Sequence, residues 1–198
     1  MAGPPEVALE IVTTSQVSPT YKTPPTLPKI TMNGNPFPTP GWTPSSLFSG
    51  WQLVVLDSSM DMTDPASIRV NNYIPLTPDQ SGYWSDTYGW VYDGIGRALL
   101  SAGDLESQRV FLASYGWDMN APPTAFMLQQ LLDMGGGKGA QYWETHVDRG
   151  SENQWCSNPG CYILVGGSSY SYGEGHEVYD YPGTSPVTAT LQVTLGNP

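Results

Sequence analysis

The chain has 198 residues, which favours one domain with an appendage, or two small units at most. Aromatic residues make up 12% of it and exclude a disordered chain, whereas 22 glycines and 19 prolines predict many loops and turns. Seven basic residues against 18 acidic ones give a net charge of −11, which excludes the cationic surface that nucleic-acid binding requires and disfavours anionic membranes.

The distribution of apolar residues disfavours a membrane-spanning protein and a protein exported with a cleaved signal peptide. No apolar run approaches the ~20 residues that a helix needs to cross a bilayer. The first segment, MAGPPEVALEIVTT, lacks the basic and apolar regions of a cleaved signal peptide. The sequence therefore predicts a protein made in a cytoplasm, without membrane insertion.

The first 45 residues differ in composition from the rest of the chain, with 10 prolines between Pro4 and Pro44. Each proline fixes φ, removes a hydrogen-bond donor and favours extended geometry in the residue before it. Such a segment cannot bury enough apolar surface to fold alone. We therefore predict an extended arm that acts in assembly, and we expect a chain without residues 1–45 to remain folded.

Apolar runs of strand length predict three buried strands, at residues 51–57, 109–115 and 162–166. Near the C-terminus, apolar residues alternate with Thr and Gln from Val187 to Leu195. A period of two places the apolar residues on one face, so this segment predicts a half-exposed strand.

Two helices are predicted between these strands. Residues 88–102 carry apolar side chains at helical spacing, and Gly103 follows them as a stop signal. A second helix is predicted after Asn120, a candidate N-cap, with Pro122 in its first turn and its end at Gly135–Gly137. Together these elements predict an α+β fold, a β-rich sandwich with two flanking helices.

Asp57 follows a buried strand, where α/β enzymes often keep a catalytic carboxylate. Ser58 and Ser59 come next, and this composition favours a turn over catalysis. The sequence contains no nucleophile elbow, Walker loop, zincin or kinase motif, so we expect no enzymatic activity. A second acidic group consists of Glu144, Asp148 and Glu152. Two of these carboxylates could be imagined as the pair that glycoside hydrolysis uses, but a solvated loop is the favoured interpretation.

His146, Cys156, Cys161 and His176 could in principle form a zinc site. Four residues between the cysteines is the long end of the ligand spacing, and the histidines lie on opposite sides of the pair. The residues between the cysteines, Ser157–Gly160, are a turn sequence. A short disulfide or two reduced thiols is therefore favoured, and no metal or cofactor is expected.

The 12 tyrosines and 7 tryptophans lie mostly outside the aliphatic strands. Rings with polar groups suit protein interfaces and stacking on sugars, and they equally suit capping a core under long loops, so both interpretations stay open. Five of these rings are candidate binding residues that could converge on one rim if the chain keeps the element order of the family that it resembles, as described below: Trp117, Trp143, Trp155, Tyr170 and Tyr172.

Five segments follow one another in an order that resembles a known family. They are Leu53–Asp57, Arg109–Tyr115, Leu131–Gly135, Cys161–Gly166 and Gly173–Glu177. They are similar to the opening strand, the central strand, the second helix with its terminal glycine, the last core strand and the glycine-and-Glu stretch of the interleukin-like EMT inducer domain, also called the GG domain. The resemblance runs from Trp51 to about Tyr181. It divides the chain into a Pro-rich arm (1–45), a GG-like domain (46–182) and a C-terminal strand (183–198).

The resemblance implies a compact sandwich and a binding module rather than an enzyme. The domain occurs in cytokine-like proteins, in glycan-transferase stems and in phage tail-fibre proteins. Because no signal peptide or disulfide framework is predicted here, we expect a bacteriophage virion component (tail, baseplate, fibre or capsid surface). Its GG-like domain would dock to neighbouring subunits or to its own copies, or bind host glycan. The alternative is a cellular carbohydrate-binding or signalling module outside any virion, cytoplasmic or non-classically exported.

Overall fold

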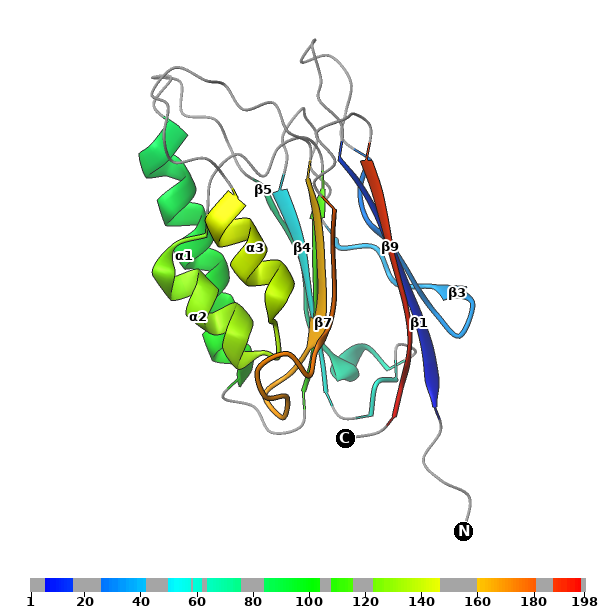
Figure 1. Cartoon of the computed structure of the whole chain (residues 1–198). Coiled ribbons are helices and arrows are strands. Elements are labelled where there is room, and N and C mark those ends of the chain that lie inside the picture. The colour runs from blue at the N-terminus through cyan, green and yellow to red at the C-terminus, as the bar shows by residue number, and fades with distance from the viewer. Residues whose placement is uncertain are drawn as a thin grey trace.

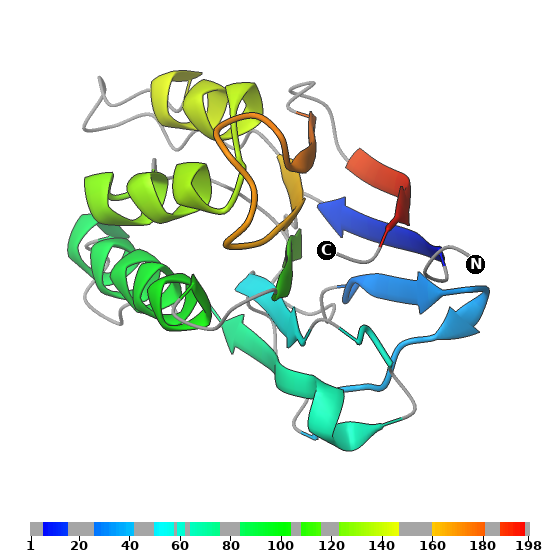
Figure 2. The same cartoon turned by 90° about the horizontal axis from the view of Figure 1, so that it is seen from below.

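The computed structural model describes residues 6–15, 26–41, 50–57, 59–61, 64–75, 84–103, 108–115, 123–146, 160–180 and 187–196. In this part of the chain, three α-helices cover one face of a five-stranded sheet, and a four-stranded sheet covers the other face (Figures 1 and 2). The prediction of an α+β, β-rich sandwich is confirmed, with three flanking helices in place of two.

The central sheet is antiparallel throughout, in the order β5-β4-β6-β7-β8. Every residue of its three inner strands is buried, because both faces of the sheet are covered. This double burial explains why these three segments are unbroken apolar runs rather than alternating ones. The bounds are β4 (Gly50–Leu56), β5 (Ile68–Pro75), β6 (Arg109–Tyr115), β7 (Cys161–Gly166) and β8 (His176–Asp180).

The helical layer consists of α1 (Trp84–Gly103), α2 (Ala125–Asp133) and α3 (Lys138–His146). Ile95 and Leu99 of α1 are buried in the core between this layer and the sheet, as the predicted stripe requires. The N-cap of α2 is Thr124, whose hydroxyl accepts a hydrogen bond from the N–H of Met127, and not Asn120. Asn120 and Pro122 lie outside the described residues.

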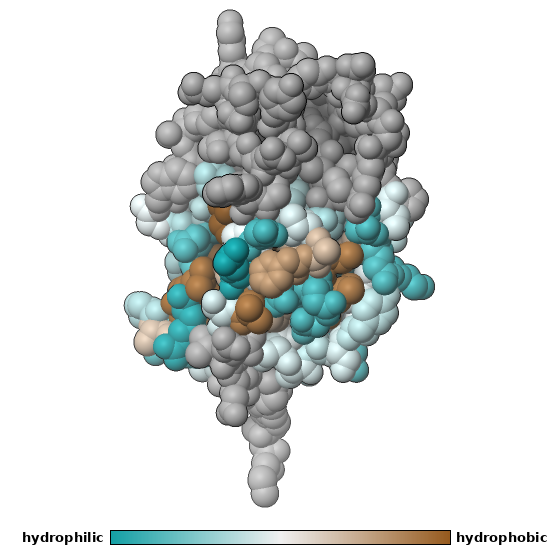
Figure 3. All heavy atoms as spheres, turned by 90° about the vertical axis from the view of Figure 1, so that its left-hand side faces the viewer, coloured by the Kyte–Doolittle hydropathy of each residue, from teal (hydrophilic) through white to brown (hydrophobic). Residues whose placement is uncertain are grey.

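The outward face of the helical layer mixes polar and hydrophobic side chains (Figure 3). Among the side chains that the structure describes, Leu100 on α1 and Phe126 on α2 are large exposed hydrophobic residues. Phe126 packs over Gly96 of α1, where a Cβ atom would lie 2.9 Å from the Phe126 ring. The glycine thus allows the two helices to approach closely. No helix in the described part of the chain is both long and apolar enough to cross a membrane.

The second sheet has the order β3-β2-β1-β9 and joins the two ends of the chain. Its longest strands, β1 (Val7–Ser15) and β9 (Val187–Leu195), pair antiparallel from Val7 opposite Leu195 to Ser15 opposite Val187. The alternation predicted for residues 187–195 is confirmed, since the even-numbered residues are exposed and most odd-numbered residues are buried. Two short strands complete the sheet, β2 (Lys29–Met32) and β3 (Asn35–Pro36).

A second core lies between the two sheets, and it changes the interpretation of the N-terminal segment. Leu9 and Ile11 of β1 and Met32 of β2 are at most 2% exposed and pack in this core. The described parts of residues 1–45 are indeed extended, but they are integral strands rather than an arm that stands apart. Their prolines lie outside β1 and β2, so both ladders can form.

Candidate functional site

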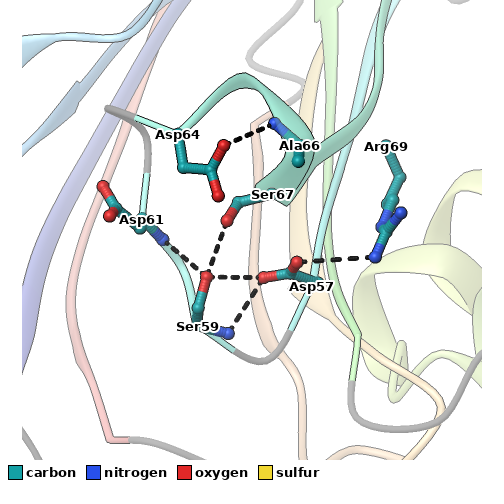
Figure 4. A network of polar contacts seen from close by, with 7 residues as sticks. All are labelled: Asp57, Ser59, Asp61, Asp64, Ala66, Ser67 and Arg69. Atoms are coloured by element: carbon teal, nitrogen blue, oxygen red, sulfur yellow. Dashed lines mark hydrogen bonds and ion pairs between the residues drawn. The ribbon is translucent and has the colours of Figure 1, made fainter.

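The loop after β4 contains the first predicted candidate, Asp57 (Figure 4). Its Oδ1 atom accepts hydrogen bonds from the N–H of Ser59 at 3.0 Å and from the Ser59 hydroxyl at 2.6 Å. The Ser59 hydroxyl also lies 2.7 Å from that of Ser67, and Arg69 Nη2 lies 3.6 Å from Asp57 Oδ2. The carboxylate therefore closes a turn with Ser59, as predicted.

The same contacts set the charge state of Asp57. Hydrogen bonds from Ser59 lower the pKa of its carboxyl below the ordinary value of 3.8, helped by Ser67 and by the positive charge of Arg69 and opposed by partial burial. A carboxyl with a lowered pKa is ionised at neutral pH. It therefore acts as a fixed anion that orders this loop, and not as a proton donor.

Replacing Asp57 by asparagine should lower the free energy of unfolding by up to about 1 kcal/mol at pH 7, because the site is partly exposed. The folded pKa lies below the unfolded one, so this stabilisation is present above pH 3.8 and is lost as the pH falls through the folded value. The parent and D57N should therefore converge in acid. Urea titrations across pH measure the difference. D64N is the matched control, because Asp64 caps η1 (Pro65–Ser67) through one bond to Ala66 N–H that Asn can also accept.

A second carboxylate, Glu177 of β8, binds the N-terminus of α3. Its oxygens accept hydrogen bonds from the N–H groups of Gly139 and Ala140, both at 2.8 Å, and from the Tyr162 hydroxyl at 2.6 Å. The Gly137 N–H adds a longer bond at 3.3 Å. An anion here satisfies donors that the first turn of a helix leaves unpaired and interacts favourably with the helix dipole. The helix α3 therefore begins directly after Gly135–Gly137, where the sequence predicted that a helix ends.

Replacing Glu177 by glutamine should destabilise the fold by about 1–3 kcal/mol, because the amide loses the charge and places a donor against backbone donors. Chemical denaturation measures the change. The matched control is E174Q: Glu174 accepts one hydrogen bond, from the Ser171 N–H at 2.8 Å, in an exposed loop. An E177Q variant no less stable than E174Q would contradict the role of Glu177 in stabilising α3.

The loop between α2 and α3 is joined to the loop between β7 and β8 through glycines. Gly173 N–H donates to Gly136 C=O at 3.1 Å, and Gly175 N–H donates to Gly135 C=O at 2.9 Å. Gly135 has a φ of +93°, and a Cβ atom there would lie 2.6 Å from the Cβ of Tyr170. We name Gly135, Gly136, Gly173 and Gly175 the glycine clasp. Two of the segments that carry the family resemblance therefore lie side by side.

The predicted binding residues do not all reach the surface. Trp143 of α3 is fully buried, with its ring centroid 5.3 Å from those of Trp51 and Tyr92 and 6.0 Å from that of Tyr162. Its assignment to a binding rim is therefore wrong, because α3 turns this ring into the core. Trp117 and Trp155 lie outside the described residues.

The two predicted tyrosines differ in their surroundings. Tyr170 is half-buried, and the Arg109 guanidinium lies over its ring at 5.0 Å from the centroid. This stacking helps to hold a guanidinium whose residue is only 5% exposed. Tyr172 is 55% exposed, and its hydroxyl donates a hydrogen bond to Gln141 Oε1 of α3 at 2.9 Å. Of the predicted binding residues that the structure describes, Tyr172 is the one best placed to contact a partner.

Further aromatic rings lie next to Gln141 along α3. Tyr179 of β8 is 38% exposed and packs against Tyr142, with ring centroids 5.2 Å apart and planes at 32°. A Cβ atom at Gly139 would lie 2.5 Å from the Tyr179 ring, so this glycine lets the ring approach the helix. We name Gln141, Tyr142, Tyr172 and Tyr179 the tyrosine surface. The candidate residues from the sequence did not include Tyr142 and Tyr179, whose proximity depends on how β8 packs against α3.

The two described residues of the disfavoured zinc alternative, Cys161 and His176, lie apart. Cys161 is a free thiol buried between the two sheets, where burial raises its pKa to about 11. Cys161 lies opposite Asp180, whereas His176 lies opposite Val165 at the other end of the β7–β8 ladder, about 13 Å away at strand spacing. Cys156 and the His146 side chain lie outside the described part. No group of three His, Cys, Asp or Glu residues in the described ranges could hold a metal ion.

Of the three acids considered as an alternative pair for glycoside hydrolysis, the structure describes one. Glu144 is a half-buried residue of α3, and Asp148 and Glu152 lie outside the described residues. The candidate site that the described residues support is therefore the tyrosine surface. A scan against protein-family models gave no match for this chain, and a search of curated proteins gave none either.

Proposed function

We propose that this chain is a non-enzymatic structural and binding protein, a component of a bacteriophage virion. In this proposal its GG-like domain contacts neighbouring subunits or host glycan through the tyrosine surface. The observation that carries the binding role is the exposure of two rings against α3: Tyr172, which is hydrogen-bonded to Gln141, and Tyr179, which packs against Tyr142. Exposed rings with hydrogen-bonding groups provide contact area at low cost in conformational entropy.

The use of the carboxylates favours a binding role over catalysis. Asp57 closes a turn, and Glu177 binds the N-terminus of α3. Asp93 of α1 accepts a hydrogen bond at 2.7 Å from the hydroxyl of Thr124, the N-cap of α2. Each of these acids contributes to the fold through its oxygens.

A rigid base supports the tyrosine surface. Tyr172 belongs to the loop held by the glycine clasp, and Tyr179 lies two residues after Glu177 in β8. The Tyr172 hydroxyl is hydrogen-bonded to Gln141 of α3, and Glu177 hydrogen-bonds the strand that carries Tyr179 to the same helix. A preorganised aromatic surface loses little entropy on binding.

The virion assignment is tested by locating the chain in particles. A phage that encodes it with an epitope tag would be purified from a lysate and labelled with gold-conjugated antibody for negative-stain microscopy. We expect gold at one fixed position on the particle. Unlabelled particles with all of the tagged chain free in the lysate would contradict the virion assignment and favour the cellular module.

The binding role is tested separately with single substitutions. Tyr172→Ala and Tyr179→Ala should each weaken binding at least about tenfold, as truncation of an aromatic residue at a binding hot spot does. Binding would be measured to purified host surface polysaccharide and to particles that lack this chain, which distinguishes glycan from subunit contact. The matched control is Phe126→Ala, an exposed ring elsewhere on the helical layer. Equal binding by all three variants would contradict the role of the tyrosine surface.

A further inference from the structure

We infer that two copies of this chain associate through the free edge of β9, in an antiparallel pairing of β9 with the β9 of the second copy. In Figure 2, β9 lies at the end of its sheet, beyond β1. Within the described ranges β9 pairs with β1 alone. In an antiparallel ladder, every second residue of such an edge strand turns its N–H and C=O away from its neighbour, where they can pair with another strand.

The other three sheet edges each carry a feature that discourages strand addition. β3 is two residues long and contains Pro36, and β8 is five residues long and contains both Glu177 and Asp180. β5 has an irregular register at Arg69 and ends at Pro75, and its Asn71 side chain donates to the Pro38 carbonyl at 2.7 Å. Short length, charge, proline, bulges and coverage are the usual means by which proteins protect an edge.

β9 has none of the charges, prolines or register irregularities found at the other described edges, and it is longer than β3 and β8. Its nine residues, VTATLQVTL, contain no charge, proline or glycine, and its ladder with β1 runs over all nine without a shift in register. Threonine, valine and leucine dominate it, and the first two have high β-propensity. A long, regular and uncharged edge is favourable for pairing with another strand.

The sequence of β9 fits a second copy of itself. In antiparallel pairing about a two-fold axis at Leu191, Thr188 lies opposite Thr194 of the second copy and Thr190 lies opposite Gln192. The remaining pairs, Val187 with Leu195 and Ala189 with Val193, keep the buried side chains of both copies on one face. Threonine pairs across strands are favourable, and a two-fold interface of this kind closes as a dimer.

Charge also favours β9 over β8 as the contact edge between identical chains. The chain carries a net charge of −11, so two copies repel each other at long range. β9 places no charged residue opposite its own copy, whereas β8 carries Glu177 and Asp180. Like charges placed opposite each other destabilise strand pairing. This inference does not rest on the proposed function, since it names a different surface and holds inside or outside a virion.

Sedimentation velocity of the full chain over a range of concentrations tests the inference. We expect the parent chain to shift from monomer to dimer as the concentration rises, because an edge contact is small compared with a standard interface. T190K/Q192K should stay monomeric, since a lysine of each copy would then face a lysine of the other. T190E/Q192K should dimerise again, since a glutamate of each copy would face a lysine of the other. In both variants the lysine at position 192 lies beside Glu10 of β1, the partner of Gln192 within the chain.

Circular dichroism and melting curves of the two variants control for folding, since both substitute exposed side chains. A parent chain that stays monomeric at all concentrations would overturn the inference, and would leave another molecule as the occupant of this edge. A dimer that T190K/Q192K does not disrupt would place the contact on another surface. If T190K/Q192K disrupts the dimer and T190E/Q192K does not restore it, the register about Leu191 is wrong.

Discussion

Replacing Trp143 by alanine should lower the free energy of unfolding by about 3–5 kcal/mol, the usual effect of deleting a large buried aromatic side chain. The indole is fully buried between α3 and the central sheet and contacts the rings of Trp51, Tyr92 and Tyr162. Its loss leaves a cavity that three rigid rings cannot collapse to fill. A residue at a binding rim would instead affect a partner and not the fold. Denaturant titration with near-ultraviolet circular dichroism measures the effect.

Two variants control this measurement. Trp143→Phe keeps an aromatic ring in the same place and should lose clearly less stability than W143A. Tyr172→Ala removes a ring that is 55% exposed and should leave the unfolding transition nearly unchanged. If W143A unfolds at the same denaturant concentration as Y172A, Trp143 does not belong to the core.

Deleting residues 1–45 should abolish cooperative unfolding of the remaining chain. The deletion removes β1, β2 and β3, and with them the neighbours of β9 and most of the layer over one face of the central sheet. Buried residues of that face, Val54, Phe111 and Ile163, would then contact water. This reverses the expectation from composition alone, in which an arm could be removed without loss of the fold. Thermal melts and binding of a hydrophobic dye measure the outcome.

Two smaller changes near the N-terminus separate the effect of losing β1 contacts from the effect of shortening the chain. Ile11→Ala, at a fully buried position, should cost about 2–5 kcal/mol, whereas deletion of residues 1–5 removes none of the described strands. A chain without residues 1–45 that still melts cooperatively would show that the central sheet and helices fold without the second sheet.

The spacing of apolar residues predicted those helices and strands whose buried side chains can be recognised from their own segment of sequence. The runs in β4, β6 and β7 are apolar at most inward and outward positions, and the alternation in β9 identifies its buried face. The stripe in α1 predicted its buried side in the same way. In each case the side chains that pack in the core stand at regular spacing in the sequence.

Elements that depend on distant partners could not be predicted in this way. The helix α3 begins directly after Gly135–Gly137 because the carboxylate of Glu177, about 40 residues later, accepts hydrogen bonds from its first turn. Because the sequence did not predict α3, it did not indicate that Trp143 lies on a buried helix face, and we assigned this residue to a binding rim. Similarly, β1 carries its apolar residues at strand spacing, but its partner lies at the other end of the chain and the surrounding prolines dominated the interpretation.

The pairing of β1 with β9 has a consequence for how the chain reaches its native state during synthesis. Residue 7 lies opposite residue 195, so the ladder between β1 and β9 cannot be completed until residues 7–195 have left the ribosome. Until then, one face of the central sheet has at most a partial cover. Contacts between residues so far apart in sequence form slowly, because a long loop must close first. The nascent chain should therefore fold late and expose apolar surface during elongation, and chaperones should bind it until β9 emerges.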